Sequence, residues 1–502
     1  MEPLDRVACY RAIQTRDSRF DGRLFVGVSS TGIYCRPICP ARTPRIENCR
    51  FFSSAAAAQA AGFRPCLRCR PESAPELASW RGTSNTVSRA LALIADGGLD
   101  GRNTGVEALA ARLGVGARQL RRLFAQHLGA SPVAVAQTRR VLFAKQLLHE
   151  TRTSLAEVAL AAGFGSVRRF NETFQDLFGR PPGALRRGRA IDPGSTSATA
   201  GVTLRVRYRP PYDWSAMLAF LEARAIDGVE EVSSHAYRRT VAVDGESGTV
   251  EVRHDPARQA LVVSVHFPCI RALSSIVARV RRVFDLDADI ETIGEHLSRD
   301  PLLARLVSRR PGLRAPGGWD GFELAVRAIL GQQITVSAAR RLASQLVVLC
   351  GGGLPTSQQS VPALTRLFPS PAQVAAADLR ALGMPTARQA ALKAIADAAL
   401  VDPDLFRPSA TVEDAIERLR AITGVGEWTA QYIAMRALRE TDAFPATDRG
   451  LLRGAAAATR AVVTPADLLE RAESWRPWRA YAAQHLWMSD AFSADRRAVT
   501  HA

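Results

Sequence analysis

Lysine is almost absent from this chain. Only Lys145 and Lys393 occur among the 66 basic residues of its 502, so any reaction that needs a lysine amine has two candidates. The sequence also lacks an uninterrupted apolar run long enough to cross a bilayer, and Asp5 and Arg6 interrupt the apolar residues where a secretory signal would begin. We therefore expect a cytoplasmic protein with no membrane partner.

Cysteine is also scarce, and its spacing is informative. Four of the eight cysteines stand as Cys35-x3-Cys39 and Cys66-x2-Cys69, a pattern that predicts a closed zinc site made of four thiolates. The other four are scattered, which fits a reducing compartment and predicts no structural disulfides. These four are Cys9, Cys49, Cys269 and Cys350.

The positive charge is concentrated in the first part of the chain. The formal net charge is +18, and residues 1–190 hold 29 Lys+Arg against 14 Asp+Glu. This part is therefore the better candidate for binding a nucleic-acid backbone. A chain of this length exceeds one ordinary hydrophobic core, so we expect three or four domains.

The zinc-site cysteines lie in a distinctive local sequence, TGIYCRP at 31–37 and GFRPCLRC at 62–69. Residues 1–78 resemble the metal-binding domain of the adaptive-response (Ada) DNA alkylation regulators. The resemblance implies one zinc ion on Cys35, Cys39, Cys66 and Cys69. It also implies that Cys35 is the nucleophile that takes a methyl group from a methylated DNA phosphate, with Arg64 among the DNA contacts.

Methylation of Cys35 would remove one negative charge from the zinc–thiolate cluster and so raise its affinity for DNA. The alternative is a purely structural zinc site, which is the commoner fate of four cysteines in an intracellular chain.

Residues 83–187 show helical periodicity with two helix-turn-helix patterns. The first covers 106–115 and 118–124, and the second covers 155–164 and 167–174, each with a glycine near the turn. Residues 83–187 resemble an AraC-type DNA-binding domain, whose tail reads A-x3-G-F-x-S-x3-F-x3-F-x4-G-x-x-P, a pattern that residues 159–182 follow closely. The alternative is a generic bundle of short helices with solvated arginines. The predicted DNA-contacting residues are Arg118, Arg121, Arg122, Arg168 and Arg169.

A small polar segment at 188–201, broken by proline and glycine, is predicted to be a flexible linker. Alternating apolar residues then predict strands at 202–208 and 261–265 around a helix at 214–225. We therefore expect a small α/β (TBP-like) domain at 202–270, and helices again at 271–496.

Two motifs in the last part of the chain carry chemistry. Residues 419–430, LRAITGVGEWTA, predict helix, tight Gly-x-Gly hairpin and helix, in which backbone amides can approach a DNA phosphate. Residues 444–451, FPATDRGL, place Asp448 where a loop enters a helix. Together they resemble the helix-hairpin-helix DNA glycosylase superfamily, which implies that Asp448 is catalytic.

The resemblance becomes more specific in four further segments. They are YRPPYDWS at 208–215, FELAVRAILGQQIT at 322–335, WRPWRAY at 475–481 and HLW at 485–487. Residues 202–496 are similar to 3-methyladenine DNA glycosylase II (AlkA-like). This implies a base pocket of Trp428, Tyr432, Trp487 and Phe220 and DNA contacts at Gly424, Gly426, Thr429, Gln333 and Ile334. The alternative for each aromatic residue is core packing.

The scarcity of lysine now discriminates between reaction types. Relatives that also cut the strand carry a Schiff-base lysine where this chain has Trp428, so we expect a monofunctional enzyme. No cysteine follows Cys350, so we expect no C-terminal iron–sulfur cluster. A monovalent cation at the hairpin is a further candidate cofactor.

Three positions depart from the family patterns. The wedge leucine of the family corresponds to Gln333, with Ile334 beside it, and the tyrosine after the catalytic aspartate corresponds to Arg449. Pro268-Cys269-Ile270-Arg271 resembles the Pro-Cys-His-Arg acceptor of the alkylguanine methyltransferases, but it lacks the activating histidine. We therefore expect Cys269 to be buried and inert.

We expect a mainly α, multidomain protein that joins a zinc methyl-phosphotriester domain, an AraC-type double helix-turn-helix and an alkylpurine DNA glycosylase. Its expected partners are alkylated and promoter DNA, with RNA polymerase as a further candidate, and the protein is expected to be a nucleoid-associated monomer. One alternative is an alkylation-triggered transcription activator with a weak or degenerate glycosylase half. Another is a front half that only tethers the glycosylase to DNA.

Overall fold

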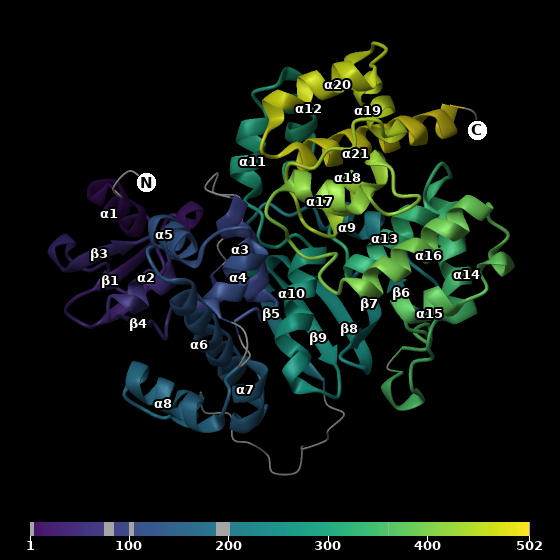
Figure 1. The fold of residues 1–502 in the computed structure, drawn as a ribbon. Helices are drawn as coiled ribbons and strands as arrows, with labels where there is room; N and C mark the ends of the chain where they lie inside the picture. The colour runs from purple at the N-terminus through teal and green to yellow at the C-terminus, as the bar shows by residue number, and fades with distance from the viewer. Residues whose placement is uncertain (1–4, 75–84, 100–104, 187–200, 360, 501–502) are drawn as a thin grey trace. The chain divides into compact units, whose positions relative to one another are not determined.

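The structure is a computed structural model that describes residues 5–74, 85–99, 105–186, 201–359 and 361–500 (Figure 1). It divides into two compact units, which are treated separately below. The first unit comprises residues 1–207 and 260–278, and the second comprises 208–259 and 279–502. Almost all of the predicted linker at 188–201 lies outside the described residues.

The first unit begins with the segment that resembles the Ada metal-binding domain, which is a small zinc-site α/β domain. Its four-stranded sheet has the order β3-β1-β2-β4, in which only β2 and β4 pair in parallel. Two small apolar cores form around this sheet, one of which includes the fully buried Tyr34. The elements are α1 (Arg6–Gln14), β1 (Phe25–Val28), β2 (Ile33–Cys35), β3 (Cys49–Phe52), α2 (Ala55–Ala60) and β4 (Arg64–Pro65).

The two predicted helix-turn-helix patterns are confirmed as helix pairs. Local capping explains their boundaries: Ser154 and Glu157 form a capping box, and Gly129 and Gly179 end helices in left-handed conformation. Phe170 packs against Phe174, which packs against Phe178, so one face of the last helix is core. The helices are α3 (Asn85–Ala95), α4 (Val106–Arg112), α5 (Ala117–Leu128), α6 (Pro132–Glu150), α7 (Leu155–Ala161) and α8 (Val167–Phe178).

One of the two lysines lies in this unit. Lys145 of α6 is fully buried, and its Nζ donates to the Cys66 carbonyl oxygen at 3.0 Å and to Glu72 Oε2 at 2.5 Å. Burial raises the pKa of Glu72, but bonding from His149 and the charge of Lys145 outweigh it and hold that pKa at about 2. The positive charge of the Lys145 ammonium group is therefore paired with the Glu72 carboxylate inside the protein.

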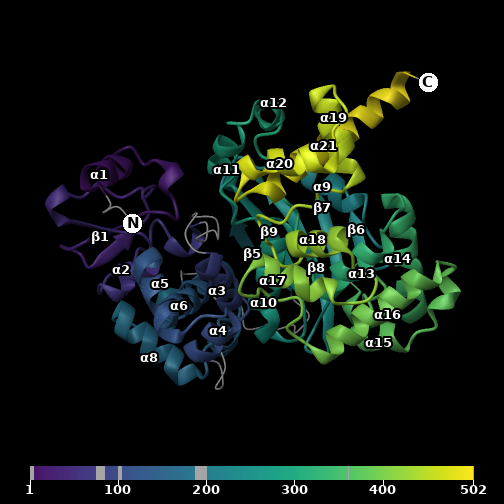
Figure 2. The same cartoon turned by 45° about the horizontal axis from the view of Figure 1, so that its top comes forward.

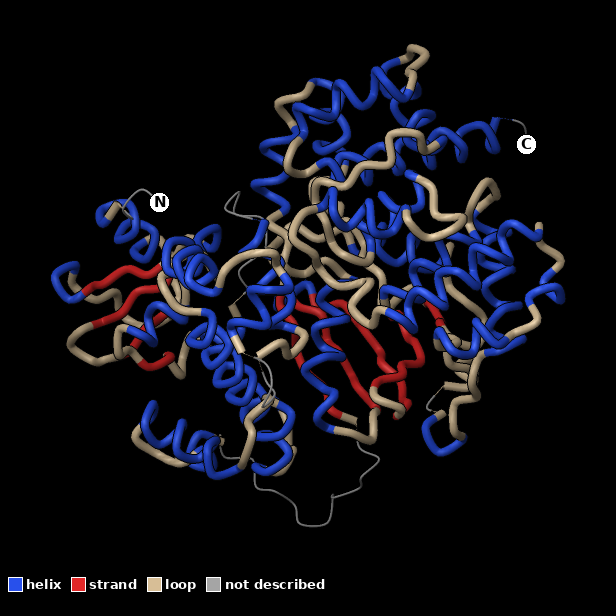
Figure 3. Tube along the Cα trace, viewed as in Figure 1, coloured by secondary structure: helices blue, strands red, loops and turns tan. Residues whose placement is uncertain are grey.

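The predicted strands of the α/β segment are also confirmed. In the first unit β5 (Val202–Arg207) pairs antiparallel with β9 (Ala260–His266). In the second unit β6, β7 and β8 form an antiparallel meander, and α9 (Trp214–Glu222) occupies the region of the predicted helix. Figure 3 shows these strands in red. The meander strands are Glu230–Val232, Ala236–Val243 and Glu246–Asp255.

Helices make up most of the remaining chain, as expected. The views in Figures 1 and 2 agree that α19, α20 and α21 lie together. Gly454 permits this packing, because a Cβ there would lie 2.0 Å from the Leu486 carbonyl oxygen of α21. The earlier helices are α10 (Leu273–Val283), α11 (Ile290–Leu297), α12 (Pro301–Arg309), α13 (Gly321–Leu330), α14 (Val336–Cys350) and α15 (Pro371–Ala376). The later ones are α16 (Thr386–Val401), α17 (Val412–Arg420), α18 (Glu427–Arg436), α19 (Arg449–Thr459), α20 (Pro465–Ala472) and α21 (Arg479–Thr500).

Within the described residues, no helix combines the length and the apolar composition that a membrane span needs.

Candidate functional sites

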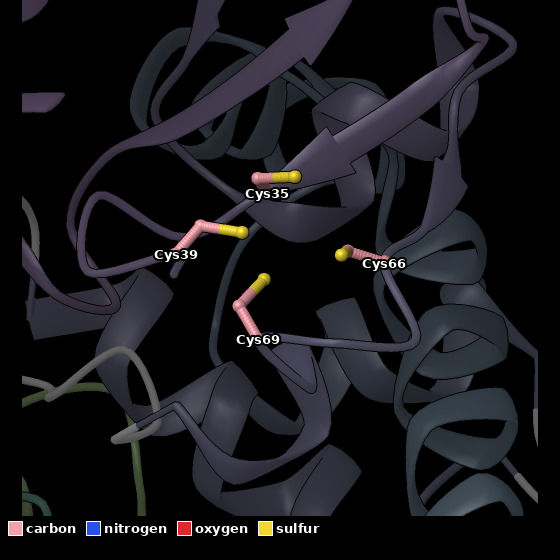
Figure 4. Close-up of side chains that lie close together, drawn as sticks. All are labelled: Cys35, Cys39, Cys66 and Cys69. Atoms are coloured by element: carbon pink, nitrogen blue, oxygen red, sulfur yellow. The ribbon is translucent and has the colours of Figure 1, made fainter. Parts of the chain in front are cut away.

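The four predicted zinc ligands converge (Figure 4). Cys35 ends β2, Cys39 follows in the next turn, and Cys66 and Cys69 lie directly after β4. Their four Sγ atoms all lie within 4.8 Å of one another. Tetrahedral zinc with bonds of about 2.3 Å spaces its sulfur ligands about 3.8 Å apart, so a slight contraction of this cluster accommodates the ion.

The surroundings of the cluster also suit zinc. Backbone N–H groups of Arg36 and Arg68 point to the sulfurs of Cys69 and Cys66 at 3.4 and 3.3 Å, which is the outer-sphere bonding that thiolate ligands receive. Hydrogen bonding from the neighbouring thiols, Cys39 first, raises the pKa of Cys35. A divalent ion supplies the positive charge that four crowded thiolates require.

Exposure does not single out one ligand as the nucleophile. Cys66 and Cys69 are buried, whereas Cys35 and Cys39 are both partly exposed. The assignment of Cys35 therefore depends on its local sequence. Cys269 is partly exposed at the start of a short 3-10 helix, so the expectation that it is buried is wrong. The chain leaves β9 at His266, three residues earlier, and turns at the surface.

The predicted DNA-contacting arginines are placed at the starts of α5 and α8. Their side chains are exposed, because the apolar residues of both helices face the opposite way. Arg121 and Arg168 pair with glutamates at 2.7 Å, pairs that are weak at such exposure and can be exchanged for phosphates. Arg118, Arg122 and Arg169 are exposed too, and Arg64 on edge strand β4 is half-buried.

The predicted hairpin lies between α17 and α18. Gly424 has a φ of +82°, and a Cβ there would lie 2.3 Å from the Cβ of Ala391. Gly426 precedes α18 with open space around it and no side-chain cap. Since Gly426 makes no side-chain cap hydrogen bond to the first amides of α18, these amides can bind an anion.

Gly424→Ala is expected to destabilise the second unit by about 2 kcal/mol, because it combines a left-handed φ with overpacking. Gly426→Ala is the matched control, with an expected change within about 0.5 kcal/mol. Calorimetric unfolding of the two variants measures the difference. Equal changes in the free energy of unfolding for the two variants would contradict the special role assigned to the backbone conformation of Gly424.

Asp448 is held by two indoles. It is the N-cap of α19, where Oδ1 accepts from the Leu451 backbone N–H at 2.9 Å. Nε1 of Trp487 donates to the same Oδ1 at 2.8 Å, and Nε1 of Trp428 donates to Oδ2 at 2.8 Å. Three N–H donors at a helix N-terminus thus fix the position of the Asp448 carboxylate.

The predicted pocket aromatics are brought together beside this carboxylate. Trp428 and Tyr432 stack at 5.4 Å between ring centres, and Tyr432 meets Trp487 edge to face at 6.3 Å. All three rings remain partly exposed, as does Phe220 on α9. None of these four side chains is fully buried, and both tryptophans bond Asp448; their assignment to a base pocket stays a prediction.

Sequence reasoning missed three residues here. Gly450 lets Trp487 approach, since a Cβ there would lie 3.0 Å from both Asp448 Oδ1 and Trp487 Cδ1. Gln332 Nε2 bonds the Gly424 carbonyl oxygen and Thr429 Oγ1, each at 3.0 Å. The third is Arg436, which follows Trp428 and Tyr432 at intervals of four, a spacing that places all three on one helix face.

The other predicted contacts fall into two groups. Gln333 is exposed with a φ of +58° in the loop between α13 and α14, and Ile334 beside it is half-buried. Arg449 is exposed at the start of α19. Thr429, however, is 2% exposed, so its side chain braces the hairpin through Gln332 rather than reaching a DNA surface.

Three family models match separate parts of the chain. The metal binding domain of Ada matches residues 8–72, a helix-turn-helix domain matches 109–188, and the AlkA N-terminal domain matches 203–320. A probable bifunctional transcriptional activator/DNA repair enzyme AlkA of Mycobacterium tuberculosis is 43% identical over 485 residues, covering 95% of each chain. The chain belongs to this family of bifunctional activator/repair enzymes.

Members of this family combine the two halves that the sequence predicted. DNA-3-methyladenine glycosylase 2 of Escherichia coli is 36% identical over 293 residues, which cover 58% of this chain and 98% of that protein. The solved 3-methyladenine DNA glycosylase of Archaeoglobus fulgidus superposes with a TM-score of 0.51 at 22% identity, covering 57% of this chain and 98% of its own. The glycosylase fold is therefore confirmed.

Proposed function

We propose that the second unit hydrolyses the N-glycosidic bond of alkylated purines, of the 3-methyladenine and 7-methylguanine type. The observation that carries this proposal is the Asp448 carboxylate, partly exposed beside partly exposed aromatic rings and held by Trp428 and Trp487 at 2.8 Å. A flipped, positively charged base can stack on these rings while its sugar lies next to the carboxylate.

The geometry supports an electrostatic role for Asp448. As the bond breaks, positive charge develops on the sugar, and a preorganised carboxylate stabilises it. Oδ1 already accepts two N–H groups, whereas Oδ2 accepts only one. The lone pair left on Oδ2 can orient the attacking water.

The product is an intact strand with an abasic site. The position where bifunctional relatives carry a lysine holds Trp428, whose indole bonds Asp448. The only lysine of the second unit is Lys393, which is exposed and donates to the Ala375 carbonyl oxygen at 3.0 Å. No Schiff base is expected at the site.

For the first unit we propose that Cys35 takes the methyl group of a DNA methylphosphotriester. The Cys35 thiolate attacks the methyl carbon, the carbon–oxygen bond breaks, and the phosphodiester leaves as an anion. Cys35, Cys39, Cys66 and Cys69 would hold a zinc ion, which would keep the Cys35 sulfur deprotonated. The cluster becomes less negative by one charge, which strengthens binding to DNA by the helix-turn-helix pairs.

The proposal extends to the partners. The helix-turn-helix pairs read promoter DNA, and the protein acts as a monomer that contacts RNA polymerase. A monovalent cation binds to backbone carbonyl oxygens at the Gly424–Gly426 hairpin. The cation and the first amides of α18 then contact the same DNA phosphate.

Base release tests the glycosylase proposal. The full chain is incubated with a duplex carrying one 7-methylguanine, and free base is measured by chromatography. We expect base release with the strand intact until alkali cleaves the abasic site. Strand cleavage without alkali would contradict the monofunctional mechanism, and no release would leave only the activator function.

A further inference from the structure

A buried cation lies against the aromatic rings of the proposed base pocket. Arg436 ends α18 and is 2% exposed. Its guanidinium carbon lies 4.8 Å from the ring centre of Phe220, 5.1 Å from that of Trp487 and 5.7 Å from that of Tyr432. Three of the four rings assigned to the base therefore already interact with a positive charge.

No ion pair in the described part of the chain neutralises Arg436. Its Nη1 donates to the Pro316 carbonyl oxygen at 2.8 Å and its Nη2 to Gln484 Oε1 at 2.7 Å, while its buried Nε has no hydrogen-bond partner. Burial lowers the pKa of Arg436 to about 10, which leaves it charged at neutral pH. Arg239, which is also buried, instead pairs with Glu323 at 2.7 Å.

We propose that Arg436 determines how the pocket discriminates between charged and uncharged purines. The rings of Phe220, Tyr432 and Trp487 already interact with the charge of Arg436, so they attract a cationic base less strongly. The same charge also repels a cationic base that stacks on these rings. With Arg436 in place, the preference of the pocket for cationic alkylated purines over uncharged purines is smaller than the rings alone would create.

This inference rests on the proposed glycosylase function, and it differs from a structural role for the same side chain. Arg436 also joins Pro316 to Gln484, so its loss can loosen the pocket. Loosening affects both classes of base alike, whereas loss of the charge raises activity on the cationic base alone. The ratio of the two activities separates these roles.

The test compares Arg436→Met with Arg436→Lys in the full chain. Single-turnover kcat/KM is measured on two duplexes that differ only in the target base, cationic 7-methylguanine or uncharged hypoxanthine. In Arg436→Met the ratio of the first to the second is expected to rise roughly tenfold, while Arg436→Lys keeps the wild-type ratio. Arg418→Met, on the surface of α17, controls for the loss of one positive charge.

A ratio that stays constant in folded Arg436→Met would overturn the inference while leaving the glycosylase function intact. If that variant does not fold, an inhibition experiment on the wild-type protein tests the inference instead. Inhibition by N-methylquinolinium is compared with inhibition by uncharged quinoline, and we expect quinoline to inhibit at least as strongly. A tenfold preference for the cation would also overturn the inference. If the wild type releases neither base, it is the proposed function that fails.

Discussion

Asp448→Asn is expected to reduce single-turnover base release by about a thousandfold or more. The substitution removes the charge that stabilises the developing sugar cation. It also places an amide N–H₂ against donors, because the indoles of Trp428 and Trp487 and the Leu451 amide all point N–H groups at this side chain. The measurement is chromatographic release of base from a duplex at saturating enzyme.

Two controls make this result specific. Asp467→Asn alters an exposed aspartate of the α20 capping box and should leave base release unchanged. Affinity of the Asp448→Asn variant for uncleaved duplex should also persist, since the hairpin of α17 and α18 is untouched. Full activity of Asp448→Asn would refute the assignment of the catalytic carboxylate.

Cys35→Ala is expected to abolish methyl uptake and to reduce alkylation-induced promoter activation at least roughly tenfold, because the charge change on the cluster no longer occurs. In the wild type, peptide mass spectrometry after reaction with methylphosphotriester DNA should find one methyl group on Cys35. Reporter activity in treated cells measures the second effect.

Cys39→Ala is the matched control, since it also removes one zinc ligand and Cys39, like Cys35, is partly exposed. Metal content of both variants shows how far the loss of a ligand accounts for the effect. A methyl group found on Cys39 in the wild type would contradict the assignment. Unchanged promoter activation in Cys35→Ala would refute the sensing role.

Features that depend on short stretches of sequence were predictable. The spacing of the four cysteines, the helix pairs and the Gly-Val-Gly hairpin all follow from local rules, and the structure confirms each of them. Gly424 is an example, because a left-handed turn between two amphipathic helices needs a glycine whatever surrounds it.

Features that depend on packing between distant segments were not predictable. Trp428 and Trp487 were predicted to stack on the base, but only their three-dimensional placement shows that both indoles bond Asp448. Thr429 was expected at the DNA surface, yet its side chain is buried. Gln332, from the loop between α13 and α14, donates a hydrogen bond to its Oγ1. Arg436 gives no sign in the sequence of its burial against Phe220, which lies more than 200 positions away.

The burial of Lys145 has a practical consequence for labelling the protein. Of the two lysine side chains, that of Lys145 is enclosed and bonded to Glu72, whereas that of Lys393 on α16 is exposed. Amine-reactive dyes applied to the folded chain will therefore modify only one of the two lysine side chains. The native sequence thus provides a single attachment point on the glycosylase for a fluorophore or a tether, without engineering.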